Sequence, residues 1–450
     1  MKVFIDTLGC EKNTNDSQFA AGFLIDAGHE IVSDPYESDA ILVITCAFIR
    51  DAKKQSIEHI FDMYEIASGS KVLAIAGCLS ERYREELQLP EADILIGVND
   101  YDKLPAMLEA ALAKKKGAEA DTCKCGDCQM VSFCEKPEDF YTPEKRDYSR
   151  LLYSDTLKIA EGCNNICTYC IIPYIRGTYR SKPFENCVEE AKRMAMAGVK
   201  ELLVIAQDTT YYGKDLYGSF RLAELLRELC KIDGIAWIRL LYCYEESITD
   251  ELIDVIASED KICKYLDIPV QHSTDKILKA MNRRSTHNSI MSTIDKLRER
   301  VPGIHIRTTL ITGFPGETKE DFEELCEFVE TVRFDRLGAF AYSREEGTIA
   351  YDMKPQVRSD VKDRRANKIM EIQNHISYEL NSEKIGSVLE TIVEGMDEDG
   401  SYYGRSRFDA PDIDCAVLFK SGEILSPGDI VNVLITDAFD YDLVGEHIAS

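Results

Sequence analysis

Short apolar runs alternate with amphipathic segments along the first quarter of the chain. Residues 16–27 and 50–67 have helical periodicity, and Asp16 is placed to cap the first of these helices. The runs that predict strands are 2–7, 40–45, 71–76 and 93–97. Such alternation is typical of a parallel α/β sheet, so we predict an α/β domain over residues 1–117.

A second series of strands and helices begins near residue 151, after a segment without periodicity. Its predicted strands are 156–160, 201–206, 235–241, 265–270, 304–311 and 336–342, and its predicted helices include 185–197, 222–231 and 319–332. Six strand–helix units predict an open or partial TIM-type barrel over residues 151–381, with active groups at the carboxyl ends of the strands. Residues 118–150 are predicted to be a linker.

The last part of the chain has a third pattern. One long helix is predicted at 359–385, and short alternating runs separated by Gly and Asp follow at 388–393, 402–407, 416–419 and 430–436. This spacing is typical of a small antiparallel β-barrel, which we place at residues 382–450.

The charge balance is strongly acidic. The chain carries 53 Lys and Arg against 80 Asp and Glu, a formal charge of −27, which opposes non-specific binding to nucleic acid. Residues 386–450 have fourteen acidic side chains against three basic ones, a net charge of −11. This region is therefore expected either to attract a basic protein or to form an inert solvated face.

Cysteine usage and hydropathy bear on the compartment. The chain has sixteen cysteines, it opens on a predicted strand with no secretory signal, and no apolar run approaches the about 18 residues that span a membrane. We therefore expect a cytoplasmic protein, in a reducing environment where thiols bind metal or stay free.

Three cysteines stand together after the first strand of the predicted central barrel. Cys163, Cys167 and Cys170 form a Cys-x3-Cys-x2-Cys loop. A [4Fe-4S] cluster normally takes four thiolates, so three would leave one iron open to a reactive ligand. The alternative is a structural zinc loop, although zinc sites usually pair two Cys-x2-Cys halves.

Three more cysteines follow predicted strands of the N-terminal domain, at Cys10, Cys46 and Cys78. The carboxyl ends of parallel strands share one edge, where ligand sites of open α/β folds collect. The spacing therefore supports either a second three-thiolate cluster or three buried structural cysteines.

The predicted linker holds four cysteines of its own, Cys123, Cys125, Cys128 and Cys134. They predict either an additional metal knuckle or free thiols, because Cys-x-Cys-x2-Cys-x5-Cys is not a standard ligand spacing.

Other polar residues follow strands of the predicted central barrel. They are Gln207-Asp208, Gln271-His272 and the turn 313–316, and His272 is as compatible with a structural role as with a site. We interpret Cys187, Cys230, Cys243, Cys263 and Cys326 as packing residues, because they lack ligand spacing.

Several segments together resemble the radical S-adenosylmethionine methylthiotransferases. The segment 161–170, with Ile172-Pro173 and Arg176-Gly177, resembles the radical motif of that family. The segments 8–13, 45–49 and 77–79 resemble its N-terminal ligand segments, and 307–318 resembles a late barrel strand and turn. The segments 404–406 and 410–414 resemble the C-terminal TRAM domain of the branch that modifies a ribosomal protein.

The resemblance implies two [4Fe-4S] clusters. Cys163, Cys167 and Cys170 would hold the cluster that binds S-adenosylmethionine, and Cys10, Cys46 and Cys78 would hold an auxiliary cluster that carries sulfur. Tyr169, Gln207 and Arg307 are our predicted S-adenosylmethionine contacts, from their place near strand ends. The central domain would then be a radical S-adenosylmethionine barrel.

The implied reaction adds a methylthio group to the β-carbon of an aspartate in the twelfth small-subunit ribosomal protein. S-adenosylmethionine would be both methyl donor and source of a 5′-deoxyadenosyl radical, so an electron donor and a sulfur donor are implied partners.

Two other functions agree less well with the sequence. A tRNA methylthiotransferase would use the same chemistry, but the acidic terminal barrel opposes RNA binding. A non-enzymatic electron carrier would gain nothing from a vacant iron.

Three features depart from the family pattern. Tyr244-Glu245-Glu246 stands where Tyr-Pro is frequent, Cys415 stands where glycine commonly follows Ile-Asp, and the linker cysteines are additional.

Overall fold

The structure is a computed structural model that describes residues 1–87, 89–117, 129–133 and 140–448. The chain forms two compact units. Unit 1 comprises residues 1–151, 161–164 and 170–193, and unit 2 comprises residues 152–160, 165–169 and 194–450. The four cysteines of the predicted linker knuckle lie outside the described residues.

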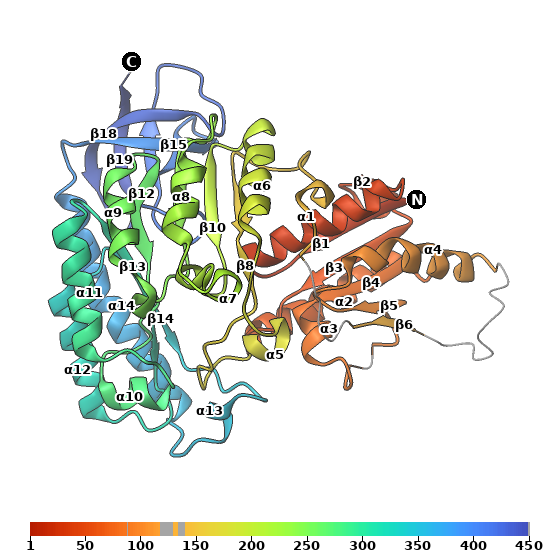
Figure 1. Ribbon diagram of the computed structural model, residues 1–450, viewed down its shortest axis with the longest axis horizontal. Helices are drawn as coiled ribbons and strands as arrows, with labels where there is room; N and C mark the ends of the chain where they lie inside the picture. The colour runs from red at the N-terminus through yellow and green to blue at the C-terminus, as the bar shows by residue number, and fades with distance from the viewer. Residues whose placement is uncertain (88, 118–128, 134–139, 449–450) are drawn as a thin grey trace. The chain divides into compact units, whose positions relative to one another are not determined.

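Unit 1 contains a six-stranded parallel sheet in the order β2-β1-β3-β4-β5-β6 (Figure 1). Its strands are β1 (Lys2–Thr7), β2 (Glu30–Val32), β3 (Ala40–Thr45), β4 (Val72–Gly77), β5 (Ile94–Ile96) and β6 (Met130–Ser132). Its helices are α1 (Glu11–Asp26), α2 (Arg50–Ala67), α3 (Cys78–Arg82), α4 (Leu104–Lys115) and α5 (Ile172–Arg176). The parallel sheet confirms the predicted fold of this region.

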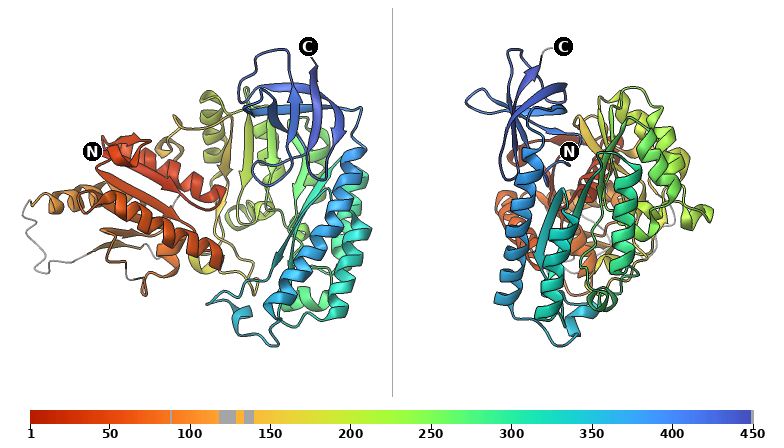
Figure 2. Two further views of the ribbon diagram at one scale, coloured as in Figure 1. Left: turned by 180° about the vertical axis from the view of Figure 1, so that it is seen from behind. Right: turned by 90° about the vertical axis from the view of Figure 1, so that its left-hand side faces the viewer.

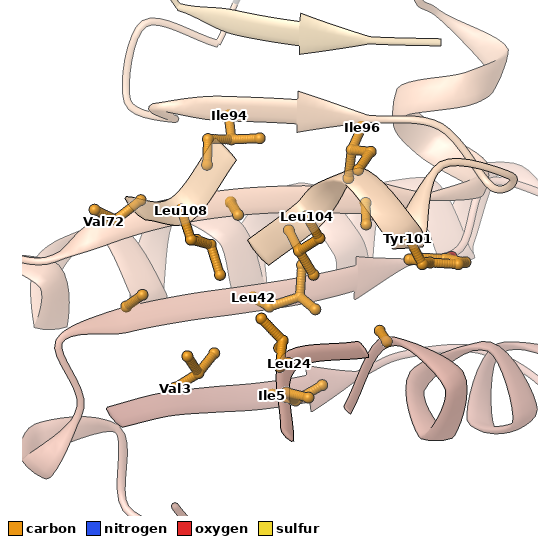
Figure 3. Close-up of a cluster of buried hydrophobic side chains, with 14 of the residues drawn as sticks. Val3, Ile5, Leu24, Leu42, Val72, Ile94, Ile96, Tyr101, Leu104 and Leu108 are labelled. Atoms are coloured by element: carbon orange, nitrogen blue, oxygen red, sulfur yellow. The ribbon is translucent and has the colours of Figure 1, made fainter. Parts of the chain in front are cut away.

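Strands β3 and β4 are buried along their whole length, which explains their continuous apolar runs. On one face of the sheet, Leu24 of α1 and Leu104 and Leu108 of α4 pack against strand residues such as Leu42 and Ile94 (Figure 3). Short β2 and β6 were not predicted.

Unit 2 contains a second sheet of six parallel strands, in the order β14-β13-β12-β11-β10-β7. These are β7 (Ser154–Lys158), β10 (Glu201–Ile205), β11 (Trp237–Leu240), β12 (Ile262–Asp267), β13 (His305–Thr312) and β14 (Arg336–Ala341). Its helices are α7 (Lys214–Tyr217), α8 (Leu222–Cys230), α9 (Asp250–Ser258), α10 (Asp275–Ala280), α11 (His287–Arg300), α12 (Lys319–Val332), α13 (Ile349–Asp352) and α14 (Ser359–Ser382). The sheet stays open, as expected for a partial barrel.

Three short or boundary elements complete this region of the chain. They are β8 (Ala160–Glu161), β9 (Arg180–Ser181) and α6 (Phe184–Met196).

The predicted fourth strand of the barrel is displaced. The structure places β12 at Ile262–Asp267 rather than at 265–270. The apolar run Ile268-Pro269-Val270 misled the prediction, because proline cannot donate to a ladder and ends the strand. The polar pair Gln271-His272 therefore lies in a loop beyond the strand.

The C-terminal region is a closed five-stranded barrel, drawn in blue in Figure 2. Its strands are β15 (Val388–Met396), β16 (Tyr402–Ser406), β17 (Val417–Lys420), β18 (Ile430–Ala438) and β19 (Leu443–Ile448). Strand β19 was not predicted, and its pairing with β17 is parallel, whereas the other pairs are antiparallel.

The terminal barrel packs against the six-stranded sheet of unit 2 (the large sheet), at the amino-terminal halves of its strands. Glu201, the first residue of β10, accepts hydrogen bonds from Arg239 at 2.8 Å and from Arg405 at 2.6 Å. Arg336, the first residue of β14, donates to Asp409 at 2.6 Å. These groups are buried, so the terminal barrel is fixed by paired charges as well as by apolar contact.

The paired charges predict an acid-sensitive contact. Burial opposes ionisation of Glu201, but Arg405 and Arg239 outweigh it and lower its pKa from 4.5 to about 2. Asp409 is shifted in the same way, from 3.8 to about 2, mainly by Arg336. A carboxyl whose pKa is lowered by folding stabilises the fold above its unfolded pKa, and that stability is lost as pH falls through the folded value.

We therefore expect the terminal barrel to separate from the large sheet as pH falls from about 4.5 towards 2. The sole tryptophan, Trp237, reports on this contact because it is buried and its Nε1 donates to Glu390 of β15 at 2.5 Å. The test is an acid titration of its fluorescence. In the Glu201→Gln variant the steep part of the fluorescence transition should be absent. The control variant Glu398→Gln, at an exposed site, should keep it. Identical fluorescence titration curves for the two variants would contradict the prediction.

Among the described residues, none of the helices combines the length and the apolar composition needed to cross a membrane.

Candidate functional site

Cys10, Cys46 and Cys78 follow three neighbouring strands of unit 1. Cys10 precedes the first residue of α1, Cys46 directly follows β3, and Cys78 is the first residue of α3 after β4. Because β1, β3 and β4 are adjacent and parallel, the three thiols lie at one edge of the sheet. Cys10 is exposed, Cys46 is half-buried and Cys78 is buried.

Two close contacts hold the loops of this edge together. A Cβ on Gly9, which has φ +100°, would lie 2.8 Å from Cys46 Cβ and 3.1 Å from Cys46 Sγ. Gly77, with φ +94°, would place a Cβ 2.7 Å from the Thr45 carbonyl oxygen. Only glycine allows the first and third loops to approach the second this closely.

Asn13 ties all three loops to one another. Its Nδ2 donates to the carbonyl oxygens of Leu8 at 2.6 Å and Thr45 at 3.1 Å. Its Oδ1 accepts from Arg176 Nη2 at 2.9 Å, and the Cys78 thiol lies 3.9 Å away. The buried amide therefore fixes the spacing of the three cysteine loops.

Arg176 supplies positive charge to this edge. It is buried, its Nη2 lies 3.7 Å from Cys78 Sγ, and its Nη1 donates to Asp16 at 2.8 Å and approaches Glu161 at 3.3 Å. Burial alone would lower the pKa of Arg176, but Asp16 and Glu161 hold it well above its usual value. A permanent cation beside the thiols stabilises bound thiolate.

The thiols interact electrostatically. Burial, opposed in part by Arg176, raises the pKa of Cys78 to about 12, and the nearby Cys46 and Cys10 thiols add to the rise. Burial likewise raises the pKa of Cys46. These thiols therefore hold their protons in the ligand-free protein, and a metal centre that binds there would displace the protons.

Three thiols are the donor set that an iron–sulfur cluster takes when one of its irons is left open. The described residues contain no group of three or more His, Cys, Asp or Glu side chains placed to hold a metal ion. An iron–sulfur cluster makes a different demand, because its thiolates bind separate irons. Three thiols on neighbouring loops beside a cation meet that demand.

Cys163, Cys167 and Cys170 lie on the loop of residues 162–171, between β8 and α5. Cys163 and Cys167 are buried and Cys170 is half-buried. Gly162 has φ +72°, and a Cβ there would lie 2.2 Å from the Thr178 carbonyl oxygen, so glycine is required before Cys163.

The middle of this loop is anchored within unit 2. Thr168 donates from its backbone N–H to the Met281 carbonyl oxygen at 3.0 Å and from its hydroxyl to that of Ala280 at 2.9 Å. Asn165 Nδ2 donates at 2.7 Å to Asp208, three residues beyond the end of β10. Burial, opposed by the bonds from Asn165 and Thr210, raises the pKa of Asp208 to about 6.

The predicted S-adenosylmethionine contacts have different surroundings. Tyr169 packs against a cluster that contains Phe314 and Tyr342, and Gln207 is half-buried just beyond β10. Arg307, the third residue of β13, instead donates to Asp267 at 3.0 Å and approaches Asp414 of the terminal barrel at 3.3 Å. All three assignments stay predictions.

His272 is fully buried, and its Nδ1 accepts from the Thr274 backbone N–H at 3.1 Å, while Nε2 lies 3.7 Å from Glu317. These contacts favour the structural alternative for His272. In the turn 313–316, Gly313 and Phe314 donate their N–H groups to Glu317. The cysteines interpreted as packing residues are buried or half-buried.

Two residues of these sites were not predicted: Asn13 and Arg176. Both stood within the motif segments, but spacing alone does not show that an amide or a guanidinium will meet three distant loops.

Three family models match the chain. "Uncharacterized protein family UPF0004" matches residues 2–97, "Radical SAM superfamily" matches 157–329, and "TRAM domain" matches 385–448. They fall on the N-terminal sheet, the open barrel and the terminal barrel.

Curated relatives cover nearly the whole chain. Proteins named ribosomal protein uS12 methylthiotransferase RimO are similar to it: that of Caldanaerobacter subterraneus is 50% identical over 99% of both chains. That of Acetivibrio thermocellus is 48% identical, and that of Clostridioides difficile is 46% identical, each over 99% of this chain and 98% of the relative.

Solved structures share the fold at low identity. The radical S-adenosylmethionine methyltransferase TsrM from Kitasatospora setae, with cobalamin and a [4Fe-4S] cluster bound, has a TM-score of 0.53 at 14% identity. The alignment covers 86% of this chain and 80% of that one.

Proposed function

Since this chain belongs to the ribosomal protein uS12 methylthiotransferase (RimO) family of radical S-adenosylmethionine enzymes, we propose that it uses two iron–sulfur centres, held by its six motif cysteines, to modify an aspartate of uS12. The modification is a methylthio group on the β-carbon. The acidic terminal barrel supports this substrate over tRNA.

Cys163, Cys167 and Cys170 hold the radical centre in this proposal. When bound, the clusters and S-adenosylmethionine supply the electron, the radical, the methyl group and the sulfur. The chain's part is to hold the loop still, through Gly162, Asn165 and Thr168. We assign Tyr169, Gln207 and Arg307 to S-adenosylmethionine binding. The guanidinium of Arg307 already pairs with two carboxylates, which argues against its assignment.

Cys10, Cys46 and Cys78 hold the auxiliary centre in this proposal. Asn13 fixes the spacing of their loops, and Arg176 balances the negative charge that bound thiolates bring. A structural zinc site fits either triad less well than a cluster does, because structural zinc usually takes four ligands and each triad has three thiols. In addition, Cys163, Cys167 and Cys170 lie in the region that matches the radical SAM family model.

The terminal barrel favours a basic protein as substrate. Its arginines are already paired with carboxylates: Arg405 pairs with Glu201 and Glu394, and Arg407 approaches Glu390. Within described residues 386–448, Lys420 is the only exposed cation, against eight exposed carboxylates. RNA binding needs several cations that face the solvent, and the described part of this surface offers one.

An electron donor and a sulfur donor belong to the proposal as partners. The additional metal at Cys123, Cys125, Cys128 and Cys134 remains a prediction. Serine replacement of all four should lower the iron or zinc content if these residues bind metal, and unchanged content would exclude the knuckle.

The function is tested by offering the reconstituted protein two substrates. With reductant, S-adenosylmethionine and sulfide, uS12 should gain one methylthio group in place of a hydrogen on an aspartate, and tRNA should be unchanged. Mass spectrometry of both products is the measurement. Modification of tRNA alone would overturn the choice of substrate, and absence of 5′-deoxyadenosine would overturn the radical mechanism.

A further inference from the structure

Arg283 is a buried guanidinium with spare hydrogen-bond donors. It lies in the loop between α10 and α11, and its side chain is 1% exposed. Nη2 donates to the Pro269 carbonyl oxygen at 3.1 Å and lies 3.4 Å from Glu245 Oε2. Nε and Nη1 have no hydrogen-bond partner among the described residues. Leaving charged donors unsatisfied in a buried site is costly, so such groups call for an explanation.

Other buried arginines of unit 2 are satisfied. Arg336 donates from Nε and Nη2 to Asp409 and from Nη1 to the Asp335 carbonyl oxygen at 2.9 Å. Arg239 donates to Glu201 and to the Arg407 carbonyl oxygen. Arg283 is the only arginine in the described residues with buried donors left over. The ion pair with Glu245 therefore does not account for the Nε and Nη1 donors of Arg283.

The loop that carries Arg283 contacts the loop of residues 162–171 (the radical loop), because Asn282 Nδ2 donates to the Ile166 carbonyl oxygen at 2.7 Å. Its guanidinium lies over the Tyr244 ring, 4.4 Å from the centroid. Burial alone would lower its pKa, but Tyr169, Tyr244, Glu245 and Cys167 lie near enough to raise it well above its usual value. Two of these, Tyr169 and Cys167, flank Thr168 on the loop that carries the radical-centre cysteines.

A carboxylate is the ligand that a guanidinium matches best in charge and geometry. We infer that Arg283 binds the carboxylate of a reactant beside the radical loop. This inference rests on the proposed function, whose two reactants both carry that group: the amino-acid end of S-adenosylmethionine and the side chain of the target aspartate.

Binding measurements separate the two sources. The variants are Arg283→Gln and the charge-retaining Arg283→Lys, and the matched control is Arg284→Gln, at the exposed neighbouring arginine. Equilibrium dialysis on the cluster-loaded protein gives the Kd of S-adenosylmethionine. Fluorescence anisotropy gives the Kd of a uS12 peptide that carries the target aspartate, and of the same peptide with asparagine in its place.

Loss of a charge-assisted contact should weaken one of the two ligands by about ten- to a hundred-fold in Arg283→Gln, with Arg284→Gln unchanged. Weaker S-adenosylmethionine binding alone identifies its carboxylate as the ligand. Weaker peptide binding alone, with no further loss for the asparagine peptide, identifies the aspartate. Either result supports the inference.

Unchanged affinities for both ligands in both variants would overturn the inference. Equal losses for both ligands, together with a lowered thermal unfolding midpoint, would mean that Arg283 is structural and would also overturn it. Arg283→Lys keeps the charge and provides these measurements should Arg283→Gln fail to fold. Because the readouts are affinities, they stand even if the wild-type protein fails to modify uS12, and that failure would count against the proposed function alone.

Discussion

Replacing Cys10, Cys46 and Cys78 together with alanine should abolish methylthio transfer while 5′-deoxyadenosine still forms. The three thiols lie at one sheet edge of unit 1, and the radical loop has three cysteines of its own. Removing one set of ligands therefore removes one centre and leaves the ligands of the other intact.

The iron content should fall by roughly half, because each centre takes one cluster. Iron analysis, chromatography of 5′-deoxyadenosine and mass spectrometry of uS12 are the measurements. A matched control replaces Cys230 and Cys326, which are half-buried and lack ligand spacing. The control should keep its iron and its activity. If the triple variant still inserted sulfur, the assignment of two centres would be wrong.

The second large effect is expected on stability. Arg176→Met should lower the free energy of unfolding of the metal-free protein by about 3–5 kcal/mol, the usual cost of removing one partner of a buried charge pair. Methionine fills the space of the side chain but leaves Asp16 and Glu161 buried without their cation. The substitution also removes the hydrogen bond that Arg176 Nη2 donates to Asn13 Oδ1.

Urea denaturation followed by circular dichroism measures this loss. Arg176→Lys should cost less, because the ammonium keeps the charge but not the planar fork. Arg50→Met, at an exposed arginine of the same unit, should change the stability by no more than about 0.5 kcal/mol. Equal stabilities of the Arg176→Met and Arg50→Met proteins would contradict the proposed role of the buried network.

Most strands were predictable because their burial is written in local patterns. Buried β3 and β4 read as unbroken apolar runs, and the cysteines that follow them mark the edge where the strands end. The errors came from segments whose signal is misleading, as at Ile268-Pro269-Val270, or weak. Strand β19 contains Gly and Glu, which have low strand propensity, and its place in the barrel depends on pairing with β17 and β18.

The sequence by itself determined the order of the sheets and the barrel architecture, and it singled out six candidate ligand cysteines by spacing and strand position, because periodicity and motif spacing are local properties. Only the tertiary structure decided how Arg176, Arg283 and Arg405 are used. Arg176 lies beside Cys78 at the edge of the N-terminal sheet, and Arg283 keeps two donors without partners near the radical loop. Arg405 pairs with Glu201 and so holds the terminal barrel to the sheet of unit 2. An arginine looks the same in any sequence. Its role depends on which carboxylates the fold buries beside it, and those come from residues far away along the chain.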